Sequence, residues 1–179
     1  MVPRKEGAIR ANADIEEFLN GRNNAVLLDN NVLASAWGLQ QIEKIIRLGL
    51  RVDFNQGLDA RQIARNPDVA QLLANVKWTR YIRLAYDSSA MRDDVRKAIE
   101  RLTKCGMKPE KLFFYVLVRE VDDALARIEE IDALGCIPFA QPYRDFENKI
   151  PPTTEQRRLA RWCNHKPTFK TVDYKHYKG

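Results

Sequence analysis

The sequence is poor in the residue types on which metal sites, disulfide frameworks and phosphate loops depend. Its 179 residues include three cysteines, at 105, 136 and 163, and two histidines, His165 and His176. The cysteines are odd in number and lack metal-site spacing, so the sequence favours reduced thiols. It also has no glycine-rich phosphate loop and no His-Glu-x-x-His pattern, which disfavours common kinase and hydrolase chemistries.

Long apolar runs are absent as well. No run approaches the roughly 20 residues of a membrane helix, and residues 1–20 carry charges throughout, unlike a signal peptide. We therefore expect a cytoplasmic protein without a membrane partner. The length suits one domain with its own core. No feature of the sequence specifies the substrate or the oligomeric state.

Five apolar runs, each ending in a polar cluster, are the main positive signal. They cover 25–28, 51–54, 81–86, 112–118 and 137–140. Amphipathic, helix-like segments lie among them at 14–19, 40–48, 91–103 and 122–134, and the last three end near Gly49, Gly106 and Gly135. The runs recur every 25–30 residues, the length of a strand plus a crossover helix, which predicts a parallel α/β sheet.

Charged residues inside two of these strands indicate how the sheet is covered. Asp53 alternates with Val52 and Phe54, and Arg83 alternates with Ile82 and Leu84. A doubly wound sheet would bury these charges between helices, whereas a barrel lumen accommodates them. We therefore predict an incomplete (β/α) barrel of about five parallel strands over 1–150, with a doubly wound sheet as the alternative. Asp53 and Arg83 are expected to pair across neighbouring strands.

The predicted strand ends supply the candidate binding residues, because ligands of parallel α/β folds bind beyond the carboxyl ends of the strands. These residues are Asp29, Asn30, Asn31, Gln56, Gly57, Asp59, Arg61 and Asp87. Carboxylates and amides suit ammonium and hydroxyl groups, and a strand-end glycine permits close approach of a ligand. The alternative is that these residues cap the helices that follow. No residue is assigned a catalytic or metal-binding role.

Three of these segments resemble the radical S-adenosylmethionine (radical SAM) superfamily, whose catalytic domain is a six-unit partial barrel. The segments are 26–33 (VLLDNNVL), 52–61 (VDFNQGLDAR) and 82–87 (IRLAYD), and the resemblance covers about residues 2–165. It implies a methionyl amine near Asp29 and Asn30, and a ribose near Asp87 or Gln56. Complete members bind S-adenosylmethionine and a [4Fe-4S] cluster and generate a 5′-deoxyadenosyl radical.

The cluster loop of that superfamily, commonly C-x3-C-x2-C, is missing from this sequence. The segment 2–7 (VPRKEG) resembles one that follows the last cluster cysteine in some relatives, and Cys105, Cys136 and Cys163 are too widely spaced to replace the loop. We therefore expect a truncated radical SAM-like domain that retains no cofactor and is inactive alone.

Residues 151–179 motivate a second function. They carry seven Lys and Arg residues against Glu155 and Asp173, in a chain of net charge +6, and aromatic residues lie among them. A nucleic-acid-binding module uses this composition to neutralise phosphates and stack on bases. The alternative is a basic helix and an irregular tail packed on the same domain, with Leu159 and Trp162 sealing the barrel. A third hypothesis is a lyase or isomerase with Asp87 or Asp53 as base beside Arg83.

Overall fold

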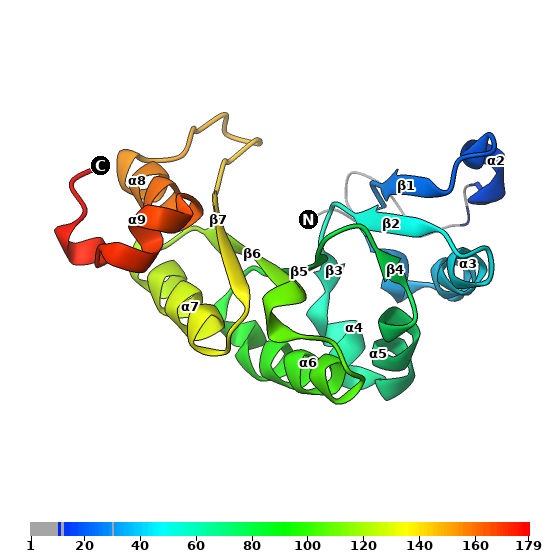
Figure 1. Ribbon diagram of the computed structural model, residues 1–179. Helices are drawn as coiled ribbons and strands as arrows, with labels where there is room; N and C mark the ends of the chain where they lie inside the picture. The colour runs from blue at the N-terminus through cyan, green and yellow to red at the C-terminus, as the bar shows by residue number, and fades with distance from the viewer. Residues whose placement is uncertain (1–10, 12, 30) are drawn as a thin grey trace.

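The computed structural model describes residues 11, 13–29 and 31–179 (Figure 1). The strands are β1 (Asn24–Leu27), β2 (Arg51–Phe54), β3 (Leu58–Asp59), β4 (Lys77–Trp78), β5 (Ile82–Tyr86), β6 (Leu112–Val118) and β7 (Ile137–Pro142). The α-helices are α2 (Glu16–Leu19), α3 (Ala36–Arg47), α4 (Ala60–Arg65), α5 (Pro67–Ala74), α6 (Arg92–Lys104), α7 (Val121–Ala133), α8 (Thr154–Asn164) and α9 (Lys166–Thr171). The 3-10 helices are η1 (Val32–Ala34), η2 (Ser89–Met91), η3 (Pro109–Lys111) and η4 (Tyr174–His176).

All pairings between these strands are parallel, which confirms the predicted α/β class. One sheet has the order β1-β2-β4 and the other β3-β5-β6-β7. Arg51 pairs with Lys77 in the first sheet and Leu58 with Leu84 in the second, each partner lying 26 residues further along the chain. The separation between paired residues is therefore the same for β2 with β4 as for β3 with β5. The two pairings share one register, although an unpaired stretch lies between them.

The side chains on the two faces of the larger sheet differ in burial. Ile82, Leu84 and Tyr86 of β5 are fully buried, as are Phe114 and Val116 of β6, and the residues between them are half-buried. Figure 1 shows α4, α6 and α7 along one side of these strands. The alternating burial therefore places the apolar core between the sheet and its helices.

The C-terminal segment packs against the last strand. Leu159 and Trp162 of α8 are buried, as predicted, and α8 lies against β7. The Asn164 side chain donates to the Ala140 carbonyl oxygen at 2.9 Å and accepts from the Ala140 N–H at 2.8 Å. One amide side chain thus satisfies both backbone groups of a residue at the outer edge of the sheet.

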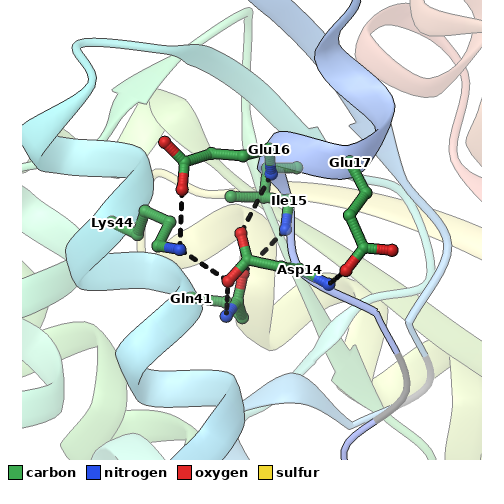
Figure 2. A network of polar contacts seen from close by, with 6 residues as sticks. All are labelled: Asp14, Ile15, Glu16, Glu17, Gln41 and Lys44. Atoms are coloured by element: carbon green, nitrogen blue, oxygen red, sulfur yellow. Dashed lines mark hydrogen bonds and ion pairs between the residues drawn. The ribbon is translucent and has the colours of Figure 1, made fainter.

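A polar network fixes α2 to α3 near the first strand (Figure 2). Lys44 donates to the carboxylates of Asp14 and Glu16, and Gln41 donates to Asp14 at 3.2 Å while accepting from the Ile15 N–H at 2.9 Å. The hydrogen bond from Lys44 is the main reason that the pKa of Asp14 falls to about 2. Ile15 is buried beside this network and anchors the segment in the core.

Local signals explain where the sequence-based assignment was right and where it failed. The predicted strands at 51–54 and 112–118 match β2 and β6, and the helices at 91–103 and 122–134 match α6 and α7 within about one residue. The helices α4 and α5 were not identified because Asn66 and Pro67 interrupt their apolar pattern; Asn66 caps α5 by accepting from the Asp68 N–H. The expectation of an irregular tail is wrong, because α9 forms with Pro167 in its first turn.

No α-helix in the described part of the chain is both long and apolar enough to cross a membrane.

Candidate functional site

The loops that follow the strands share one edge, since all strands run in the same direction. We call this edge the rim, and define it as the residues that follow the carboxyl ends of β1, β3, β5, β6 and β7. Of the predicted binding residues that the structure describes, the rim contains Asp29, Asn31, Arg61 and Asp87. Asp59 is the last residue of β3, and Gln56 and Gly57 lie in the turn between β2 and β3. Asn30 lies outside the described residues.

Asp87 is the predicted residue whose electrostatics are most unusual. It directly follows β5, and part of its side chain is exposed. Protein atoms crowd the rest of the carboxyl group and raise its pKa, while the positive charges of Arg127, Arg61 and Arg119 act in the opposite direction. No donor among the described residues forms a hydrogen bond with this carboxylate. Asp59 adds a negative charge nearby, which raises the pKa further. Asp87 is therefore an acceptor available to a ligand, with charges of both signs acting on it.

Arg127 is a buried residue that binds the backbone next to the rim. Its side chain is 1% exposed, and it donates to the backbone carbonyl oxygens of Tyr86 and, at 2.8 Å, Leu117. These carbonyls lie at the ends of β5 and β6, and Asp123 neutralises the guanidinium at 2.8 Å. Sequence analysis missed this residue. Its place beside Ile128 on the apolar face of a predicted helix was the available signal, since arginine is buried there only when paired.

Asp59 and Arg61 have a local role. Asp59 caps α4 by accepting from the Arg61 N–H at 3.0 Å, and its carboxylate also accepts from Arg61 Nε and Nη2. The helix-capping alternative is therefore confirmed for Asp59. Arg61 remains half-exposed, and its charge still acts on Asp87.

Asn31 presents an unusual polar atom at the start of η1. Its Oδ1 is buried, and no donor in the described part of the chain forms a hydrogen bond with it. An unpaired buried carbonyl oxygen is destabilising by about 1–3 kcal/mol, so a ligand that supplies a donor would gain that energy. η1 lies beside β3. The other predicted residues, Asp29 and Gln56, are exposed.

Gly57 is required by its surroundings. Its φ of +83° disfavours any other residue, and a Cβ atom placed there would lie 3.1 Å from Cδ2 of Tyr115. Close approach is therefore the reason for this glycine, but the approaching group is a protein side chain.

The predicted ion pair between Asp53 and Arg83 is confirmed. Arg83 Nε and Nη2 donate to the two carboxylate oxygens at 2.7 and 2.8 Å, and both side chains are largely buried. This bond to Asp53 is the main reason that the pKa of Arg83 is raised. Arg83 also donates to the Tyr115 hydroxyl at 3.2 Å.

A cavity of about 580 Å³ lies beside the end of β6. It is lined by Arg119, Glu120, Val121, Asp122, Thr153, Glu155, Gln156, Arg158 and Tyr174. Its two arginines and three carboxylates favour neither an anion nor a cation. None of the predicted binding residues within 31–179, nor Asp29, contributes to it.

The cysteines do not fit an iron–sulfur cluster. Cys136 and Cys163 are buried, and burial raises the pKa of each thiol to about 12, whereas cluster ligands are thiolates. Within the described residues no group of three or more His, Cys, Asp or Glu side chains is placed to hold a metal.

No family model, curated protein or solved structure matches this chain. The geometry and chemistry of the rim therefore carry the functional proposal.

Proposed function

We propose that this chain is a radical SAM-like partial (β/α) barrel whose rim binds S-adenosylmethionine or a closely related adenosyl compound. The observation that carries the proposal is a pair of acceptors at the rim, Asn31 Oδ1 and the Asp87 carboxylate, which accept no hydrogen bond from any residue that the structure describes. An ammonium group is a donor of the kind that Asn31 lacks, and ribose hydroxyls are donors suited to Asp87.

The arrangement of the strands supports the barrel part of the proposal. The register is common to both sheets, and Asp53 and Arg83 bridge β2 and β5 where the backbone pairing is interrupted. Charged and aromatic side chains then share the face opposite α6 and α7, as the lumen of a partial barrel requires.

Ligand binding, without radical chemistry, is the activity proposed for this chain. In complete enzymes of the superfamily the cluster supplies the electron for the reaction. Cys136 and Cys163 are buried and Cys105 is half-buried, and the three lie far apart in the sequence, so we assign no step to them.

Isothermal titration calorimetry with S-adenosylmethionine tests the proposal. The unmodified chain should release or absorb heat with 1:1 stoichiometry, and Asp87→Asn should weaken binding about tenfold, equivalent to about 1.4 kcal/mol for a charge-assisted hydrogen bond. Glu110→Gln, in η3 before β6 and hence at the opposite edge of the sheet, is the matched control and should leave affinity unchanged. Folded protein that binds no S-adenosylmethionine at millimolar concentration would refute the proposal.

A second candidate function, nucleic-acid binding by residues 151–179, is favoured by one observation. Exposed cations there have no carboxylate partner among the described residues; they are Arg157, Arg161, Lys166 and Lys178. The aromatic side chains are engaged elsewhere, since Trp162 packs against Phe169 and Tyr174 with ring centroids 4.8 and 5.3 Å apart. We therefore propose contact with phosphates rather than stacking on bases.

Fluorescence anisotropy with labelled oligonucleotides separates this candidate from the first. Binding should weaken as salt rises, and the double variant Arg157→Gln/Arg161→Gln should reduce both affinity and the salt slope. The control is Lys108→Gln/Lys111→Gln, which removes the same charge before β6. Affinity that is insensitive to salt or equal in the two variants would refute contact with phosphates.

A further inference from the structure

The turn at 55–57 occupies a break in the sheet. Val52 pairs with Trp78 before the break, and Leu58 pairs with Leu84 after it. Residues 53–57 have no strand pairing with residues 79–83, although Asp53 and Phe54 still pair with Val26 and Leu27 of β1. On its β1 side the turn is held by the Asn55 N–H, which donates to the Leu27 carbonyl oxygen at 2.9 Å.

Side chains take the place of the missing backbone pairing. Arg83 binds Asp53 at the first edge of the break and donates to the Tyr115 hydroxyl at 3.2 Å. Tyr115 in turn donates to the carbonyl oxygen of Asn55 at 3.2 Å, and its ring lies against Gly57. A continuous polar chain therefore reaches from β2 through β5 and β6 to the turn that contains Gln56.

The position of the Tyr115 ring is set by its neighbours. Its register partner on β5 is Ala85, whose small side chain lets the ring extend across that strand toward Gly57. Phe113 and Phe139 meet the ring edge-on, with centroids 5.3 and 5.8 Å away. The aromatic contacts fix the ring, and the ring fixes the hydroxyl.

We propose that Tyr115 is a positioning residue that holds the 55–57 turn so that exposed Gln56 meets the ligand. The inference rests on the proposed function, because it extends the ligand contact proposed for the rim to the 55–57 turn, which is hydrogen-bonded to the end of β1 through Asn55 and Leu27. Tyr115 acts through Asn55 and Gly57 and is not assigned a contact with the ligand. If Tyr115 lacks its hydroxyl, the Asn55 carbonyl oxygen loses its hydrogen-bond donor. Ligand binding must then order the turn.

Tyr115→Phe tests this inference, because it keeps the ring contact with Gly57 and removes only the hydroxyl. Hydrogen exchange in the absence of ligand should accelerate at the Asn55 amide and nowhere else in the sheet. Affinity for S-adenosylmethionine should fall about fivefold, and the double variant with Gln56→Ala should bind no more weakly than Gln56→Ala alone. Tyr81→Phe, which alters a tyrosine stacked on Phe113 with centroids 5.5 Å apart, is the matched control.

The outcomes separate this inference from the proposed function. Unchanged exchange at Asn55 in Tyr115→Phe would overturn the positioning role even if the ligand binds. Additive losses in the double variant would also overturn it. Absence of S-adenosylmethionine binding by the unmodified chain would refute the proposed function, and the exchange measurement would still decide whether Tyr115 holds the turn.

Discussion

Replacing Arg127 with methionine should destabilise the protein more than any exposed charge substitution. The variant keeps most of the side-chain volume, so its main effect is the loss of hydrogen bonds to the carbonyl oxygens of Tyr86 and Leu117. Each unpaired buried acceptor is destabilising by about 1–3 kcal/mol. Part of that loss is offset because the guanidinium no longer has to be desolvated. We expect a net loss of about 3 kcal/mol, a large share of the roughly 5–15 kcal/mol of a typical domain.

Urea denaturation followed by circular dichroism measures this loss. With a slope of about 2 kcal/mol per M, the midpoint of Arg127→Met should fall by about 1.5 M. Arg127→Lys should fall by less, since a single ammonium group reaches fewer carbonyls. Arg96→Met, at an arginine whose side chain is 59% exposed and paired with Glu130, should change stability by about 0.5 kcal/mol. A loss below about 1 kcal/mol in Arg127→Met would show that the two strand ends do not depend on this side chain.

Three further predictions concern the rim, the sheet edge and the thiols. The pKa of Asp87 is raised in the folded protein, so the folded state binds more protons than the unfolded state. Stability therefore falls as pH rises above the ordinary pKa of 3.8. Asp87→Asn should raise the urea midpoint at pH 7 and leave it unchanged at pH 3. Asn164→Ala should lower stability by about 1–2 kcal/mol and speed hydrogen exchange in β7, and unchanged exchange there would contradict the edge-sealing role. At pH 8 a thiol reagent should modify half-buried Cys105 before Cys136 and Cys163, and equal rates would show that the latter two are accessible.

The parallel fold was predictable because its signals are local. Apolar runs and glycine-terminated amphipathic helices repeat at a spacing that permits only crossover connections, and the charges of Asp53 and Arg83 indicated a polar face. The short strands β3 and β4 carry no such signal: each contains two residues, and their existence depends on pairing with a distant segment. Pairing partners are a property of the folded chain.

The candidate site was predictable only in part, for a related reason. Strand-end position identified Asp87, because a polar residue after an apolar run needs no tertiary information. It did not separate Asp87 from Asp59, which caps α4, because helix capping and ligand binding favour the same residue types. The contribution of Tyr115 depends on Ala85 in the neighbouring strand, and that relation becomes visible only with the register.

The common 26-residue register has a consequence for how related sequences can vary in length. An insertion of one residue in the turn at 55–57 would shift β3 against β5 by one residue and reverse which side chains of β3 face the helices. The register would be kept only if the segment 79–81 gained one residue as well. Homologues should therefore lengthen or shorten these two loops together, in equal steps, while the surface loop at 146–149 varies without such a constraint.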